Sequence, residues 1–432
     1  MKSAMRLYAA ALVCFALAAA SLVSGGEAKS EIPGAAASRA IRFVHGRWFN
    51  GESFESRTLY SVGGVLRAKY DGPLDSTIDL QNRFIVPPFA EAHNHHFMEG
   101  MDYRSQIETY LRQGVFYAKN PNSIPAMTEP IRQHFNRPAS IDVVYSHGGL
   151  TSTGGHPVQI YDYLARRGYV PGWTEKDMKD QAYYIIDTEA DLDSQWELIK
   201  SRKPDFIKAY LEYSEEHDVR KGDHRYYGQR GLDPKLLPKI VAKAHKDKLR
   251  VSVHVNTAAD FHNAVAAGAD EIAHLPLANI AEEDAIRAAR QGTVVVTTTL
   301  SHRRTDHVKG LEALFRDNLK LLARHGVKIA IGTDDNGRTV LDEAMNLHRL
   351  GVFDNLTLLK MWSVVTPLAI FPGRRTGRFE EGYEASFLAL DADPLSDFNN
   401  VKRISFRLKQ GEIIKVADKP EQKQNTPAPV KH

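Results

Sequence analysis

The middle of the chain, about residues 87–372, alternates short apolar runs with longer segments in which apolar residues recur at helical spacing. In chain order the apolar runs are FIVPPFAEAH, IDVVYSH, DFIKAYL, RVSVHV, EIAHL, TVVVTTTL and VKIAIGTDD. Segments between them, such as LPKIVAKAHKDK and AADFHNAVAAG, are typical of amphipathic helices. The alternation predicts an α/β fold, and the number of units favours a (β/α)8 TIM barrel.

Shorter apolar runs, broken by Gly and Asp, flank this region on both sides. Residues 29–86 contain AIRFVHGRWFN and TLYSVGGVLRAKY, and residues 373–417 contain SFLALDADP and VKRISFRLKQGEIIK. Neither segment has enough apolar residues for a core of its own. We therefore predict that they pair as one small β-sandwich domain. Residues 418–432 are rich in Pro and Gln without periodicity, which predicts a disordered tail.

The first 28 residues combine Lys2 and Arg6 with an uncharged apolar run and small residues after it, the layout of a secretory signal peptide. Cleavage after Ala20 and after Ala28 both fit, and an uncleaved membrane anchor is the alternative. We predict export, to the periplasm or the medium, and no stable membrane association after cleavage. The only cysteine, Cys14, lies in this segment, so the mature chain would offer no thiolate to a metal.

The charge balance argues against a polyanionic partner. Charged residues make up 25% of the chain and the formal net charge is +3, with no basic stripe of the kind that binds nucleic acid. A small-molecule substrate, neutral or zwitterionic, fits better. The sequence leaves the oligomeric state open and is compatible with a homo-oligomer.

Ionisable residues lie at or near the C-terminal ends of five predicted strands, and in a barrel these ends converge on one mouth. They are His93, His95, Lys208, His254, His274 and Asp334. Taken singly, each has an ordinary structural role: a packed histidine, a salt-bridged lysine or a turn-forming aspartate. As a set they predict a metal site. Residues two apart on a strand point the same way, so His93 and His95 can chelate one ion together.

The motifs AEAHNHH, DFIKAYL, VSVHVN, EIAHL and IGTDD resemble those of the amidohydrolase superfamily. The stretches HVNTAADFHNAVAAGADEIAHLP and SVVTPLAIFPGRRTGRFEEGYEASFLALDADPL are similar to imidazolonepropionase-like and dipeptidase-like members. The resemblance covers nearly the whole chain. Pro88 and Glu91 stand where Gly and Asp are commoner, and Ser386 replaces an aspartate, but no metal ligand is lost. We interpret His96, a third histidine, as structural or supporting.

The resemblance implies two divalent metal ions. His93, His95 and Asp334 would hold one, His254 and His274 the other, and a carbamylated Lys208 would bridge them. An ammonium beside two cations would be repelled, whereas a carbamate supplies negative charge and two oxygens. Ligation by nitrogen and oxygen alone suits zinc best.

The implied reaction is hydrolysis of an amide or peptide bond by a metal-bridged hydroxide, with Asp334 as the general acid and base. The substrate would be an N-acyl amino acid or a dipeptide-like molecule. A lactonase or cyclic-amide hydrolase would use the same site. A non-catalytic metal-binding scaffold is the alternative from another class.

Substrate-binding candidates lie in loops that follow the predicted strands. HGGLTSTGGHP, with His156 at its tip, is similar to a loop that meets the substrate carboxylate in dipeptidase-like relatives. A flexible turn with an exposed histidine is the other reading of this loop. Tyr210, Tyr213 and His302 are further candidates to line the substrate pocket.

Overall fold

The computed structural model describes residues 39–301 and 310–416. The predicted signal peptide and the predicted tail lie outside the described residues. Within those residues, no helix has both the length and the apolar character needed to cross a membrane.

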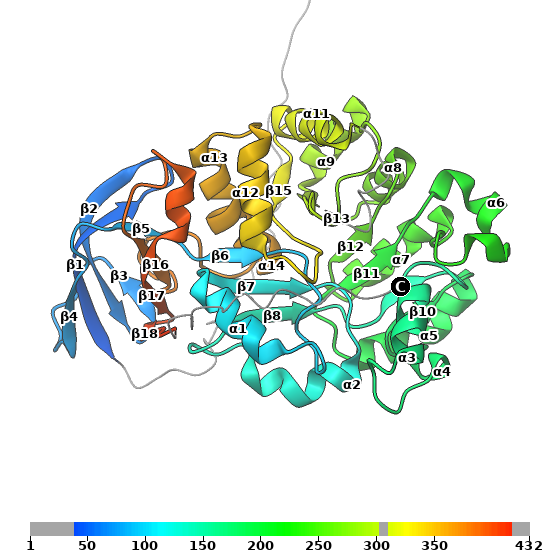
Figure 1. The fold of residues 1–432 in the computed structure, drawn as a ribbon, viewed down its shortest axis with the longest axis horizontal. Helices are drawn as coiled ribbons and strands as arrows, with labels where there is room; N and C mark the ends of the chain where they lie inside the picture. Colours follow the sequence, from blue (N-terminus) through cyan, green and yellow to red (C-terminus); the bar gives the residue numbers. More distant parts are fainter. Residues whose placement is uncertain (1–38, 302–309, 417–432) are drawn as a thin grey trace, which may run out of the picture. The chain divides into compact units, whose positions relative to one another are not determined.

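Parallel strands form the centre of the fold, in two sheets ordered β6-β7-β8 and β10-β9-β11-β12-β13-β14-β15 (Figure 1). They are β6 (Phe89–Glu91), β7 (Val115–Asn120), β8 (Asp142–Tyr145), β9 (Gly149–Thr151), β10 (Tyr183–Ile185), β11 (Ile207–Tyr210), β12 (Val251–His254), β13 (Glu271–Ala273), β14 (Val294–Val296) and β15 (Lys328–Ala330). Backbone hydrogen bonds join the two sheets on both sides. The Asp205 amide donates to the Tyr145 carbonyl at 2.8 Å and the Ala92 amide to the Ile331 carbonyl at 2.9 Å. The predicted α/β barrel is confirmed.

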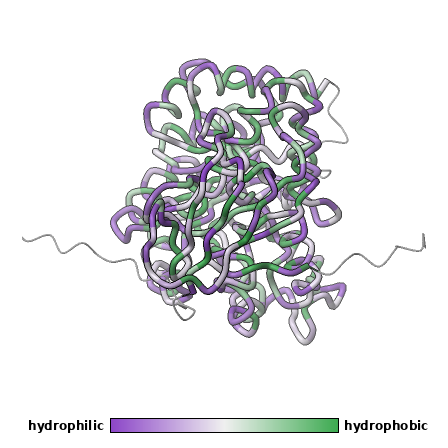
Figure 2. Tube along the Cα trace, turned by 90° about the vertical axis from the view of Figure 1, so that its left-hand side faces the viewer, coloured by the Kyte–Doolittle hydropathy of each residue, from purple (hydrophilic) through white to green (hydrophobic). Residues whose placement is uncertain are grey.

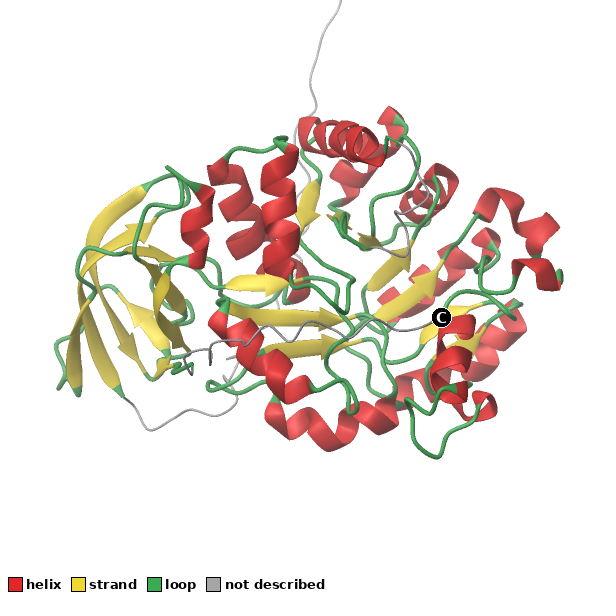
Figure 3. Cartoon of the chain, viewed as in Figure 1, coloured by secondary structure: helices red, strands yellow, loops and turns green. Residues whose placement is uncertain are grey.

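Helices surround these strands (Figure 3). They are α1 (Tyr103–Arg112), α2 (Pro125–Thr128), α3 (Val158–Arg166), α4 (Glu175–Met178), α5 (Glu189–Ser201), α6 (His217–Arg220), α7 (Leu237–Lys246), α8 (Ala258–Ala266), α9 (Glu282–Gln291), α11 (Leu311–Arg324), α12 (Val340–Leu350), α13 (Asn355–Lys360) and α14 (Thr366–Ile370). Helices α5, α8 and α12 each begin with a Thr whose side chain caps the helix together with an Asp three residues later. These caps fix where the chain turns from strand end to helix.

Strands from both ends of the described chain form one further sheet, the terminal sheet, ordered β18-β17-β16-β5-β1-β2-β3, with β4 also paired to β1. Its strands are β1 (Ala40–Phe49), β2 (Phe54–Val62), β3 (Val65–Arg67), β4 (Ser76–Asp79), β5 (Phe84–Val86), β16 (Phe387–Leu390), β17 (Ile404–Lys409) and β18 (Glu412–Ile413). The sheet curls, because Leu66 on β3 donates its amide to the Tyr383 carbonyl just before β16. The two chain ends therefore pair in one small β-domain, as predicted.

Figure 2 views the terminal sheet and shows hydrophilic and hydrophobic stretches interspersed along its strands. The buried side is aromatic: the rings of Phe43 and Trp48 on β1 each lie with their centroids 5.0 Å from that of Phe387 on β16. Edge-to-face packing of this kind adds to the stabilisation from burial alone. It fixes the amino-terminal strands against the carboxyl-terminal ones.

A buried ion network connects the terminal sheet to the barrel. Lys409 on β17 donates to Asp142 on β8 at 2.7 Å, and Arg374 lies 2.5 Å from both Asp142 and Glu384. The Tyr117 hydroxyl on β7 donates to Glu384 at 2.7 Å. Paired charges with this many hydrogen bonds can be buried without a large net cost, whereas a single one cannot.

Ser386, which stands where the resemblance leads one to expect an aspartate, belongs to this network. Its hydroxyl donates to Glu384 at 2.5 Å and accepts from the Gln410 amide at 2.8 Å. The negative charge is thus supplied by Glu384, two residues earlier. Burial alone would raise the pKa of Glu384, but the charges of Arg374 and Lys409 and the hydrogen bonds from Ser386 and Tyr117 together hold that pKa below its usual value.

We expect Glu384→Gln to lower the free energy of unfolding by about 3 kcal/mol near neutral pH, because it removes one partner of a buried ion pair. The folded-state pKa of Glu384 lies below the ordinary 4.5, so its contribution is present above the unfolded pKa and is lost as pH falls through the folded one. The difference in the free energy of unfolding between wild type and Glu384→Gln should therefore become smaller below about pH 4. Urea unfolding at a series of pH values measures it.

The control is Glu380→Gln, at an exposed carboxylate that lies 3.5 Å from Arg378. It should change the free energy of unfolding by less than about 1 kcal/mol. If the free energy of unfolding of Glu384→Gln differs from that of wild type by the same amount across the acid range, the charge of Glu384 does not stabilise the fold.

Candidate metal and active site

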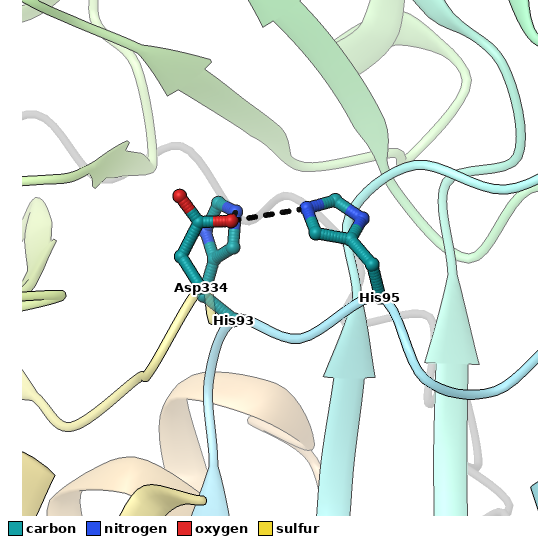
Figure 4. A group of neighbouring side chains, drawn as sticks. All are labelled: His93, His95 and Asp334. Atoms are coloured by element: carbon teal, nitrogen blue, oxygen red, sulfur yellow. Dashed lines mark ion pairs between the residues drawn. The ribbon is translucent and has the colours of Figure 1, made fainter. Parts of the chain in front are cut away.

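His93, His95 and Asp334 converge at the C-terminal ends of the barrel strands (Figure 4). Strand β6 ends at Glu91, so both histidines lie just beyond it, and Asp334 lies four residues beyond the end of β15. Oδ1 of Asp334 lies 3.5 Å from Nε2 of His93 and 3.3 Å from Nε2 of His95. One ligand atom from each residue lies within 4.8 Å of the other two.

This spacing fits a shared metal ion. Two nitrogen or oxygen ligands at the usual zinc distance, arranged tetrahedrally, are separated by about 3.4 Å. The separations of 3.5 and 3.3 Å match that value. Two imidazoles and a carboxylate are also the donor types that zinc accepts.

The two histidines are held with their Nε2 atoms towards Asp334. Nδ1 of His95 donates to the Asn122 backbone carbonyl at 3.2 Å, which fixes the tautomer and leaves on Nε2 the lone pair that a metal ion requires. His93 is 2% exposed, and burial, then the charge of Lys208, lowers its pKa well below the ordinary value. His93 is therefore neutral at physiological pH, the form that binds a metal.

Glu91 joins the two segments that carry the candidate ligands. Its Oε1 accepts from the backbone amides of His93 at 3.0 Å and Thr333 at 2.9 Å, and its Oε2 accepts from the Thr333 hydroxyl at 2.5 Å. Burial raises the pKa of Glu91 to about 8, against these hydrogen bonds, which lower it. One side chain therefore sets the spacing between the ends of β6 and β15.

Three non-glycine residues just beyond neighbouring strands have positive φ: His274 (86°), Thr298 (47°) and Asp334 (52°). Such backbone is costly for any of them, and most of all for the β-branched Thr298. A hydrogen bond of 2.8 Å joins Nδ1 of His274 to the Thr298 hydroxyl, and the same nitrogen lies 3.7 Å from Oδ2 of Asp334. The strained residues are those that face one another at the site.

The imidazole rings form a continuous arc. Ring centroids lie 5.4 Å apart for His95 and His93, 4.6 Å for His93 and His274, 4.6 Å for His274 and His254, and 4.7 Å for His254 and His156. The arc continues into a second group: His156, Glu212 and His254 place one ligand atom each within 4.8 Å of one another. Glu212 was not predicted from the sequence.

Lys208 lies in the barrel wall beside this arc. It is 1% exposed, and its Nζ lies 5.2 Å from the ring centroid of Tyr210 on the same strand. In the strand register, Lys208 pairs with Ser252 on β12 and Tyr210 pairs with His254. The predicted bridging residue is thus buried and one strand away from His254.

A buried polar layer continues from Lys208 across the strands. Ser252 donates to Glu271 on β13 at 2.7 Å, and Lys119 on β7 donates to the same oxygen at 2.8 Å. Burial raises the pKa of Glu271, but the charge and hydrogen bond of Lys119, the charge of Arg250 and the Ser252 hydrogen bond together hold that pKa below its usual value. Glu271 therefore carries its charge as the partner of Lys119.

Two of the predicted substrate-binding residues lie beside the candidate site, and a third packs against another residue. His156 and Tyr210 lie next to His254, with ring centroids 4.7 and 5.5 Å from it. The Tyr213 ring packs instead on the guanidinium of Arg220 at 3.7 Å. His302 lies outside the described residues.

Parts of this chain are similar in sequence to known proteins. Residues 207–416 match the sequence profile of the amidohydrolase family. Over 203 residues the chain is 31% identical to ochratoxinase from Aspergillus niger, an alignment that covers 43% of this chain and 42% of ochratoxinase. We refer to residues 207–416 as the amidohydrolase segment. The chain matches less than half the length of its curated relatives.

Solved structures extend the likeness of fold beyond the amidohydrolase segment. The crystal structure of A. niger ochratoxinase has a TM-score of 0.68 at 20% identity and covers 87% of this chain and 95% of that one. A Xaa-Pro dipeptidase with bound methionine has a TM-score of 0.67 at 16% identity and covers 87% and 100%. At these identities the likeness establishes the fold.

The amidohydrolase segment contains four of the six predicted metal ligands, Lys208, His254, His274 and Asp334. The other two, His93 and His95, precede it in the chain. His96, which we interpreted as structural or supporting, is 3% exposed and hydrogen-bonded to Asn94 at 2.9 Å, and burial lowers its pKa to about 4.

The sequence analysis did not predict two residues of the site: Glu91, which links two strands, and Glu212. A signal for Glu212 was present: a carboxylate four residues after Lys208, just beyond the strand end.

Glu91→Ala should weaken zinc binding by about 10- to 100-fold, because the amides of His93 and Thr333 lose the acceptor that positions the ligands beside them. Competition with a chromogenic chelator measures the affinity. Tyr110→Phe is the matched control, since it removes only the long 3.5 Å hydrogen bond to the same carboxylate. Equal zinc affinity in Glu91→Ala and wild type would show that Glu91 does not position the ligands.

Proposed function

We propose that this chain is a metal-dependent amidohydrolase that cleaves an amide or peptide bond in a small-molecule substrate. The observation that carries the proposal is the convergence of His93, His95 and Asp334 at ligand spacing, with His274 and His254 continuing the arc. Barrel enzymes hold their catalytic groups at this end of the strands. The match to the amidohydrolase profile supports the same chemistry.

His93, His95 and Asp334 would hold one divalent cation, and His254 and His274 the other, with a carbamate on Lys208 between them. When bound, the cations lower the pKa of water to near neutrality and polarise the substrate carbonyl. Zinc fits the nitrogen and oxygen donors. The burial of Lys208 supports the carbamate, because a buried ammonium beside two cations would be strongly disfavoured.

Asp334 has one oxygen for a cation and one for a proton. Oδ1 faces the two Nε2 atoms, whereas Oδ2 accepts from the Ser301 hydroxyl at 3.4 Å and lies near His274. Oδ2 would take the proton of the attacking water and deliver it to the leaving nitrogen. Asn122 and Thr298 orient His95 and His274 while this proton moves.

The proposed substrates are N-acyl amino acids and dipeptide-like amides. The relatives include an ochratoxinase, and the structural neighbours include a Xaa-Pro dipeptidase and a prolidase solved with N-methylphosphonate-L-proline. We also propose export, which the apolar amino-terminal segment after Lys2 and Arg6 supports. The intact mass of secreted protein would locate the cleavage.

The test is hydrolysis of a panel of dipeptides, amino-acid amides, N-acyl amino acids and lactones by metal-free and zinc-loaded protein. We expect amide hydrolysis only with zinc, and a loss of about a hundredfold or more in kcat for Asp334→Asn. Asp335→Asn, at the neighbouring position, is the control. Hydrolysis confined to lactones, or amide hydrolysis undiminished by complete metal removal, would contradict the proposal.

A further inference from the structure

Tyr210, the last residue of β11, has its side chain built into the wall of the barrel. The side chain is 3% exposed, and its ring centroid lies 5.5 Å from that of His254. The ring packs directly on Gly149 of the neighbouring strand β9, where the Cβ atom of any other residue would overlap it. Glycine at this position therefore lets the Tyr210 ring lie across β9, and the hydroxyl reaches the loop after β7.

The Tyr210 hydroxyl meets a donor in that loop. The side-chain amide of Asn122 donates to the phenol oxygen at 2.8 Å. Because an amide nitrogen only donates, this contact uses a lone pair of the oxygen and leaves the hydroxyl hydrogen for another acceptor. Among residues 39–301 and 310–416, the structure provides no such acceptor. Tyr210 thus offers a buried donor to a molecule bound beside it, and burying a donor is costly unless it finds an acceptor.

Asn122 places this donor between the two groups of candidate metal ligands. Its backbone carbonyl accepts from Nδ1 of His95 at 3.2 Å, while its side chain holds the Tyr210 hydroxyl. On the other side, the Tyr210 ring lies beside His254, and Nζ of Lys208 lies 5.2 Å from the ring centroid. A substrate carbonyl between the two groups of ligands would therefore lie beside the hydroxyl.

The reaction creates negative charge at such a carbonyl. When water adds to an amide, a C–O bond forms, the π electrons move onto the carbonyl oxygen, and Asp334 takes the proton of the water. A fixed donor stabilises the resulting oxyanion more than it stabilises the uncharged carbonyl, so it lowers the barrier. The Tyr210 hydroxyl meets this requirement, because Gly149 and Asn122 fix the side chain at both ends.

We propose that Tyr210 is a catalytic residue, which donates its hydroxyl hydrogen to the substrate carbonyl oxygen and stabilises the negative charge on that oxygen in the tetrahedral intermediate. The inference rests on the proposed amide hydrolysis and deepens it. It also gives Asn122 a role besides orienting His95: by donating to the phenol oxygen, Asn122 turns the hydroxyl hydrogen towards the substrate.

The experiment compares Tyr210→Phe with wild type, both loaded with zinc, on the amide of the panel that wild type hydrolyses fastest. Phenylalanine keeps the ring that packs on Gly149 and loses only the oxygen. We expect kcat to fall by about 100-fold or more, the usual loss for one oxyanion donor, with KM little changed. Zinc content should equal that of wild type.

Binding supplies a readout that does not depend on turnover. The probe is the phosphonate analogue of the same amide, in which a tetrahedral, negatively charged phosphorus group replaces the carbonyl. Calorimetry should show that it binds Tyr210→Phe about 100-fold more weakly than wild type, while the affinity for the amine product stays the same. Equal losses of affinity for the probe and the product would contradict a role in the transition state.

Asn122→Asp tests the direction of the hydroxyl hydrogen. Aspartate has nearly the same shape but accepts that hydrogen, so kcat should fall by about tenfold or more although Tyr210 is intact. Tyr145→Phe is the matched control. Tyr145, on β8, is 1% exposed, and its ring stacks on His147, which is not part of the arc. The control should keep the wild-type kcat and the wild-type affinity for the phosphonate.

An unchanged kcat in Tyr210→Phe, or a loss confined to KM, would overturn the inference and leave the proposed function standing. Loss of zinc in Tyr210→Phe would also overturn it, because Tyr210 would then support a metal ion. A wild-type kcat in Asn122→Asp would show that the hydroxyl hydrogen is not directed at the substrate. Failure of zinc-loaded wild type to hydrolyse any amide of the panel would refute the proposed function, and the inference with it.

Discussion

The site depends on how the barrel closes between its first and last strands. The backbone bonds there are few: Ala92 to Ile331 at 2.9 Å and Asp334 to His93 at 2.8 Å. The Glu91 carboxylate adds two more bonds across the same seam, from the Thr333 amide and hydroxyl. Because two histidines leave one side of the seam and Asp334 leaves the other, any change in its width changes the distances between the proposed ligands.

The charges around this seam have distinct surroundings. The histidine arc is buried, and burial holds His93 in the neutral form that binds metals. Below it, Glu271 is paired with Lys119. At the other end of the arc, Glu212 accepts a hydrogen bond from the side-chain amide of Asn256 at 3.0 Å.

Sequence periodicity predicts seven of the barrel strands, because their apolar runs are continuous. It misses β7, Val115–Asn120, in which Lys119 and Asn120 are polar yet fully inside the fold. Lys119 can be buried only because Glu271, 152 positions later, lies against it, and no local pattern reveals such a pairing. The short strands β9 and β10 are missed for a simpler reason, since runs of three residues carry no periodicity.

The sequence predicts those residues of the candidate site that lie at the ends of predicted strands. The order of His93, His254, His274 and Asp334 along the chain implies a ring once a barrel is assumed, and the structure brings these side chains together. The strand alternation invoked for His93 and His95 is not the cause, since β6 ends at Glu91. Glu212 and the surroundings of His156 depend on contacts between loops, which spacing along the sequence does not specify.

The most direct measurement is the metal content of purified mature chain, wild type beside Lys208→Ala, after loading with zinc in the presence of bicarbonate. We predict about two zinc ions per wild-type chain, one for each pair of histidines, and fewer in the variant. One ion or none in wild type, with the variant unchanged, would contradict it. Lys208 would then be a structural residue of the barrel wall, and a two-metal site would not exist.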